Sequence, residues 1–98
     1  MKKSKIILAD DGISFDGNTL KNEPLGGAET AFTSLAESLA KNHEVIIYNR
    51  CKRLVKVNGV QWIPFESIDS QECDLYIANR HFTVLPLFPK AKKRIFWI

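Results

Sequence analysis

A chain of 98 residues with 45% apolar and 26% charged residues has the composition of one small globular domain, or of part of a larger protein. Its formal net charge of +3 is mild, and no nucleic-acid motif accompanies its basic residues. The apolar run at residues 6–9 stops at Asp10, so it is too short for a signal peptide or a membrane span. These features predict a cytoplasmic protein.

Residues 5–9 (KIILA) are predicted to form a strand, because the continuous apolar run at residues 6–9 is typical of a parallel strand that is buried on both faces. Residues 10–25 are rich in Gly, Asp, Asn and Pro and predict a long loop, of the kind that often carries function. Asp10 and Asp11 stand at the carboxyl end of this strand, where ligands bind in open α/β sheets. The pair therefore predicts either a ligand contact or a cap for the loop.

A carboxylate pair at this place would also suit Mg²⁺, as in a response-regulator receiver domain. Such a domain needs a phosphorylatable Asp at the end of a later strand. The two positions that would carry it read Asn49 and Asn79. The sequence therefore argues against a receiver domain, and we expect no metal site.

Gly26 and Gly27 stand directly before a predicted helix. Backbone without a Cβ lets a ligand approach closely, and the first N–H groups of the helix suit a phosphate, a carboxylate or a sugar hydroxyl. The alternative is a tight turn that only starts the helix. Between residues 28 and 41 the apolar side chains recur on one helical face, at Ala31, Phe32, Leu35, Ala36, Leu39 and Ala40.

The rest of the chain alternates apolar runs with polar connections. Asn58-Gly59 separates two β-rich runs and predicts a hairpin in the place of a second crossover helix. The further strands are predicted at residues 45–48, 53–57, 60–65, 75–78 and 94–98. Strands joined by a helical crossover predict an α/β fold with a mostly parallel, Rossmann-like sheet and flanking helices.

Arg80 and His81 follow the strand at residues 75–78, at the same carboxyl edge as Asp10. The planar fork of Arg80 suits a phosphate or a carboxylate, and His81 has the chemistry of an acid–base group. A surface role is the alternative for each side chain. His43, between the helix and the next strand, is predicted to be a helix-end residue that the dipole favours.

Two features of composition predict no special chemistry. Cys51 and Cys73 have no second pair that would complete a zinc site, so we expect reduced, structural thiols. The basic run that contains Lys90 and Arg94 has no interleaved aromatic residues. It is therefore predicted to be a solvated loop before the last strand rather than a patch for nucleic acid or an anionic membrane.

The order of a first strand, a long loop, Gly-Gly-Ala-Glu at residues 26–29, a helix that ends near Asn-His-Glu-Val and a second strand resembles the N-terminal end of the group 1 (family 4) glycosyltransferases. Residues 58–64 (NGVQWIP) and 74–80 (DLYIANR) extend the resemblance. Those enzymes carry two Rossmann-like domains that face each other across a cleft. They transfer a sugar from a nucleotide-diphosphate donor to a hydroxyl of a glycan, lipid or small molecule, with retention and usually without a metal.

The resemblance implies that residues 1–98 are an incomplete N-terminal, acceptor-side domain and that the donor-binding domain is absent. Gly26 and Gly27 would then contact substrate through their backbone N–H groups, near Asp10 and Arg80, with no cofactor beyond the nucleotide-sugar substrate. No catalytic residue is assigned, and the 98 residues alone are expected to be inactive. The resemblance allows peripheral contact with a membrane and predicts no nucleic-acid partner.

Two other interpretations stay open. The chain would be a stand-alone flavodoxin-like module that holds a phosphate or another ligand with the same Gly-Gly turn, without catalysis. Alternatively, it would be an interaction fragment that self-associates through its apolar terminal strand, because an uncovered strand edge favours pairing with another chain.

Overall fold

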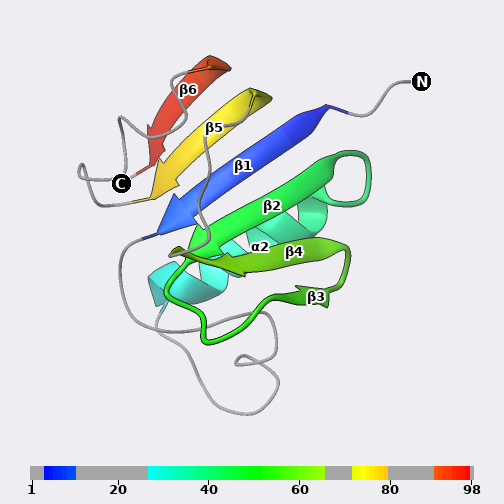
Figure 1. Cartoon of the computed structure of the whole chain (residues 1–98), viewed down its shortest axis with the longest axis vertical. Coiled ribbons are helices and arrows are strands. Elements are labelled where there is room, and N and C mark those ends of the chain that lie inside the picture. The colour runs from blue at the N-terminus through cyan, green and yellow to red at the C-terminus, as the bar shows by residue number, and fades with distance from the viewer. Residues whose placement is uncertain (1–3, 11–26, 66–71, 80–89, 98) are drawn as a thin grey trace.

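The structure is a computed structural model in which residues 4–10, 27–65, 72–79 and 90–97 are described. Its strands form a six-stranded, mostly parallel sheet in the order β3-β4-β2-β1-β5-β6 (Figure 1). The predicted α/β class is confirmed, and the arrangement is compatible with a Rossmann-like fold. The described elements are β1 (Lys5–Asp10), α2 (Gly27–Leu39), β2 (Glu44–Asn49), β3 (Val55–Val57), β4 (Val60–Pro64), β5 (Cys73–Asn79) and β6 (Ala91–Trp97).

The chain first adds strands on one side of the central strand, β1, and then on the other side. From β1 the chain adds β2 and then β4 on one side, and afterwards β5 and β6 on the other. All these strands pair in parallel, whereas β3 pairs antiparallel with β4. The boundary between β1 and β5 is therefore a topological switch point, where open α/β sheets form their ligand crevice at the carboxyl ends of the strands.

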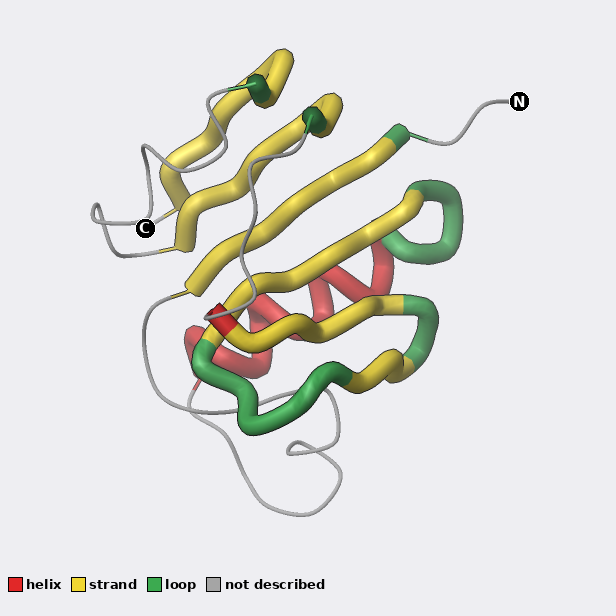
Figure 2. Tube along the Cα trace, in the orientation of Figure 1, coloured by secondary structure: helices red, strands yellow, loops and turns green. Residues whose placement is uncertain are grey.

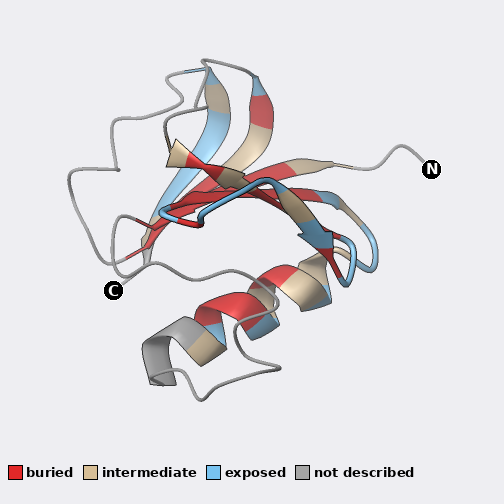
Figure 3. Cartoon of the chain, turned by 60° about the horizontal axis from the view of Figure 1, so that its bottom comes forward, coloured by how far each residue is buried: buried red, intermediate tan, exposed pale blue. Residues whose placement is uncertain are grey.

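The core lies on both faces of the sheet, which explains the unbroken apolar runs of β1 and β2. Ile6 and Leu8 share one face with Phe32 and Ala36 of α2, whereas Ile7 and other buried residues form a second cluster on the opposite face. Figure 3 shows that the buried side of α2 is turned toward the sheet and that exposed residues lie along the borders of the sheet. Successive strand residues point to opposite faces, so a strand buried on both sides has no polar alternation.

The basic run before the last strand differs from its prediction as a solvated loop. Lys90 precedes β6, but Lys92, Lys93 and Arg94 lie within that strand, which pairs with β5 from Ala91 onward. Within the parallel ladder Lys93 pairs with Leu75 and Arg94 with Tyr76, while the side chains of the basic residues stay exposed. Charged side chains are common on an edge strand because they discourage pairing with other chains.

The two cysteines lie at opposite edges of the sheet. Cys51 follows β2 at the carboxyl edge, Cys73 begins β5 at the amino edge, and both are buried free thiols. Burial raises the pKa of the Cys73 thiol above its ordinary value, and the neighbouring Lys5 opposes this weakly. The prediction of structural, unpaired thiols is confirmed.

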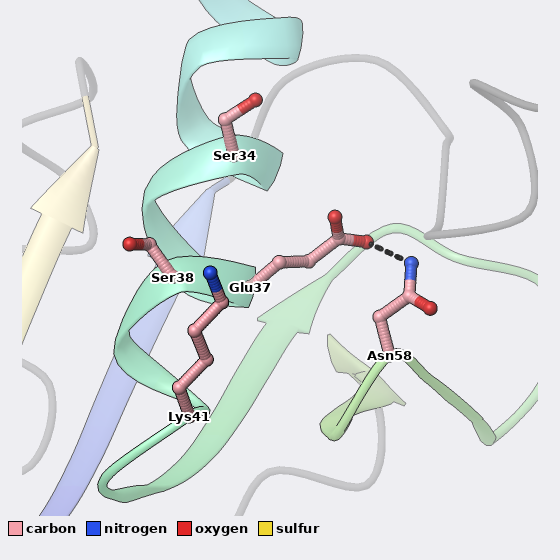
Figure 4. Close-up of a pocket in the computed structure, with 5 residues that line it drawn as sticks. All are labelled: Ser34, Glu37, Ser38, Lys41 and Asn58. Carbon is pink, nitrogen blue, oxygen red and sulfur yellow. Dashed lines mark hydrogen bonds between the residues drawn. The ribbon is translucent and has the colours of Figure 1, made fainter.

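The predicted Asn58-Gly59 hairpin is confirmed between β3 and β4. Both residues have positive φ, 50° and 85°, as a type I′ turn requires. The Asn58 side-chain amide donates a 2.9 Å hydrogen bond to the Glu37 carboxylate, which ties the hairpin to α2 (Figure 4). The connection from β2 to its parallel neighbour β4 therefore contains this hairpin in the place of a second crossover helix.

Gly59→Ala is expected to lower the free energy of unfolding by about 1–2 kcal/mol, since a Cβ at φ +85° is disfavoured and would lie 3.3 Å from the Ala40 Cβ. Urea unfolding followed by circular dichroism measures the change. Gly59→Asn meets the same Ala40 contact but tolerates the backbone better, so it should lose less. Equal losses would assign the effect to the contact with Ala40.

Tyr76 is expected to make the free energy of unfolding depend on pH in the alkaline range. Burial raises the pKa of its hydroxyl well above the ordinary value of about 10, although the Arg94 guanidinium lies 5.2 Å from the ring centroid. The unfolded chain therefore releases this proton first, and stability should fall as pH rises above about 10. Urea unfolding at pH values on both sides of 10 should show a shallower fall for Tyr76→Phe. An unchanged fall would show that Tyr76 is not its source.

No helix among the described residues is long and apolar enough to cross a membrane. Most of the predicted long loop after β1, the residues between β4 and β5, and the segment between β5 and β6 lie outside the described residues.

Candidate functional site

Helix α2 begins at the carboxyl edge of the sheet (Figure 1). It ends at Leu39, whose carbonyl accepts a 3.0 Å hydrogen bond from the His43 amide. Strand β2 starts directly after His43, at Glu44, which lies at the amino edge of the sheet. The helix therefore runs antiparallel to the strands, and its first residue, Gly27, lies at the opposite edge. Phe32 and Ala36 are fully buried against the sheet and fix this orientation.

Three buried polar side chains end the three central strands at this same edge. Asp10 ends β1, Asn49 ends β2 and Asn79 ends β5, with relative exposures of 4%, 0% and 4%. Asp10 is the direct partner of Asn79 in the parallel ladder, and Asn49 follows Tyr48, the partner of Ala9. We call these residues the carboxyl-edge triad.

The alternation of side chains places the triad on the face that α2 covers. Asp10 follows Leu8 by two residues, Asn49 follows Ile47, and Asn79 follows Ile77. Leu8, Ile47 and Ile77 all belong to the core cluster beneath α2. The triad therefore gathers a carboxylate and two amides at the switch point, on the face from which the helix begins.

The triad is partly occupied by contacts within the protein. The Asn49 Oδ1 atom accepts a 3.1 Å hydrogen bond from the Cys51 backbone N–H, which turns the chain away after β2. Asp10 also has a polar interaction within the protein. Asp10 and Asn49 therefore already make contacts within the protein, and all three side chains of the triad are almost fully buried.

Arg50 follows Asn49 of the triad in the chain, and its side chain contacts Phe65. Its guanidinium lies over the Phe65 ring, 5.9 Å from the centroid, and the residue is exposed. A cation at this distance is attracted by the face of the ring. The contact links the segment after β2 to Phe65, the residue after β4.

The structure places part of the predicted site. Asp10 and Gly27 lie at the carboxyl edge as expected, whereas Gly26, Arg80 and His81 lie outside the described residues. Sequence reasoning considered Asn49 and Asn79 only as the positions at which a receiver domain would need an Asp, and missed both as site residues. The signal was present, because the rule that pointed to Asp10 applies to the last residue of every buried parallel strand.

A hollow with a volume of about 510 Å³ lies on the outer side of α2 (Figure 4). It is lined by Ser34, Glu37, Ser38, Lys41 and Asn58. It opens toward the hairpin turn and the end of α2, away from the triad. The Glu37 carboxylate that lines it already accepts the hydrogen bond from Asn58. Its polar lining is that of a solvated helix face.

The described residues contain no group of three or more His, Cys, Asp or Glu side chains placed to hold a metal ion. Comparisons with protein-family models, with curated proteins and with solved structures find no match to this chain.

Proposed function

We propose that this chain is the N-terminal, acceptor-side part of a cytoplasmic glycosyltransferase, which moves a sugar from a nucleotide-sugar donor to an acceptor hydroxyl. One observation carries the proposal: the buried carboxyl-edge triad lies on the face of the sheet where α2 begins. Polar groups beneath a helix start, at a switch point, are the arrangement in which open α/β sheets bind phosphates and hydroxylated ligands.

In this proposal the chain binds and orients the acceptor. The Asp10 carboxylate accepts a hydrogen bond from an acceptor hydroxyl, while the amides of Asn49 and Asn79 donate to it or accept from it. The resemblance further leads us to propose that the backbone N–H groups of Gly26 and Gly27 and the Arg80 guanidinium bind the more anionic part of the substrates. The donor nucleotide belongs to a second domain, so the 98 residues alone have no transferase activity.

The direct test is a titration followed by amide chemical shifts. We expect methyl α-D-glucopyranoside and inorganic phosphate to shift the signals of Asp10, Gly27 and Asn79. Asp10→Asn should weaken the sugar response, whereas Glu44→Gln, at the exposed amino end of β2, should leave it unchanged. Shifts confined to residues away from the carboxyl edge would contradict the proposed site.

A stand-alone flavodoxin-like binding module is the second candidate. The switch point and its triad are formed by this chain without any second domain, and that observation favours it. The coding sequence downstream of Ile98 separates the two. Roughly 250 or more further codons with a second Rossmann-like pattern support the transferase, and a stop codon supports the module. Sugar transfer by the 98 residues alone would contradict the proposed division of labour.

A further inference from the structure

The connection from β2 to β3 is strongly basic and carries an exposed leucine. Lys52, Arg53 and Leu54 are all exposed, and Leu54 is 60% exposed, the highest fraction for a large apolar side chain among the described residues. We call residues 50–54 the basic edge loop. Figure 2 shows this green loop running along the outside of β4 into β3, at the border of the sheet.

Among the described residues, few carboxylates lie on the elements next to this loop. Residues 50–65 contain no Asp or Glu. Of the described carboxylates on neighbouring elements, Glu37 accepts the hydrogen bond from Asn58, and Glu44 shares a hollow with Lys56 of β3. Asp10 is buried in the carboxyl-edge triad and has an interaction of its own. The positive charge of Lys52 and Arg53 therefore faces solvent together with the Leu54 side chain.

We propose that the basic edge loop docks this protein on the surface of an anionic lipid bilayer. Leu54 enters the boundary between headgroups and acyl chains, and Lys52 and Arg53 contact the anionic headgroups. The combination favours this partner, because cations beside an exposed apolar side chain match the anionic headgroups and the acyl boundary of a bilayer, and the loop offers no aromatic ring for base stacking. The inference does not depend on the proposed function.

The fold supplies a matched control at the other border of the sheet. Strand β6 also carries exposed basic residues and an exposed apolar residue, Ile95, at 47%. There Lys92 pairs with Asp74 at 3.3 Å, and Ile95 lines an apolar groove with Leu35 and other side chains. Because β3 and β6 are opposite edges of one sheet, a flat bilayer that meets the basic edge loop does not meet β6 equally.

The test is cosedimentation of the purified protein with vesicles of phosphatidylcholine alone, or of phosphatidylcholine with phosphatidylserine. We expect binding only to the phosphatidylserine vesicles, and a loss of binding as salt is raised. A cation near such a surface contributes about fivefold to affinity, so Lys52→Glu with Arg53→Glu should weaken binding by at least about twentyfold. Leu54→Ser should weaken it several-fold.

The control proteins carry matching changes at β6 and at the residue directly before it. Lys90→Glu with Lys93→Glu changes the net charge by the same amount, and Ile95→Ser removes a comparable side chain. Both should keep most of the binding, and circular dichroism verifies that each variant is folded. Equal losses at both edges, no binding to phosphatidylserine vesicles, or equal binding to a single-stranded oligonucleotide that competes with the vesicles would overturn the proposal.

Discussion

Phe32→Ala is expected to lower the free energy of unfolding by about 3–5 kcal/mol, the range for removing a large aromatic side chain from a core. Phe32 is 0% exposed and lies in the cluster that joins α2 to β1, β2 and β4. Because small domains are stable by only about 5–15 kcal/mol, the loss should be visible as a much lower urea midpoint. The same ring fixes the helix whose start defines the candidate site.

Ser34→Ala is the control, since Ser34 lies two residues away on the exposed side of the same helix. It should change the unfolding free energy by no more than about 0.5 kcal/mol. If Phe32→Ala were as mild as Ser34→Ala, α2 would not be anchored to the sheet as described, and the carboxyl edge would lose its helix start.

Asn49→Ala is expected to lower the free energy of unfolding by about 1–3 kcal/mol, because it leaves a buried hydrogen-bonding group without its partner. Asn49 is 0% exposed, and its Oδ1 atom accepts the 3.1 Å hydrogen bond from the Cys51 amide. Urea unfolding measures the loss. Hydrogen exchange should also show faster exchange at Cys51, because this bond no longer protects that amide.

Asn42→Ala provides the comparison, since Asn42 is exposed in the connection before β2. It should be close to neutral and should leave exchange at Cys51 unchanged. Fast Cys51 exchange already in the unaltered protein would contradict the buried hydrogen bond from the Cys51 amide to Asn49.

Local patterns allowed most of the described elements to be predicted, because each depends on neighbours in the chain. The apolar spacing around Phe32 and Ala36 identified α2, and the apolar run at Ile6 and Ile7 identified β1. The Asn58-Gly59 turn requires positive φ at both positions, so the dipeptide itself predicts the hairpin. Strand ends were less accurate, since ladder pairing with a neighbour extends a strand beyond its apolar run.

The basic run illustrates that limit. Lys92, Lys93 and Arg94 have the composition of a loop, yet pairing with β5 makes them strand residues. No local signal in these residues specifies the partner strand, whose backbone groups decide the outcome. The tertiary structure also placed this run and the basic edge loop at opposite borders of the sheet, which charge counting along the chain does not reveal.

The sequence by itself determined the α/β class, the helix that follows the glycine pair, the hairpin and the place of Asp10 at the end of a buried strand. These follow from side-chain periodicity and turn chemistry, which act over a few residues. Only the tertiary structure decided that Asn49 and Asn79 join Asp10 on the face beneath α2. That gathering depends on strand order and register, which are fixed by contacts between residues far apart in the chain.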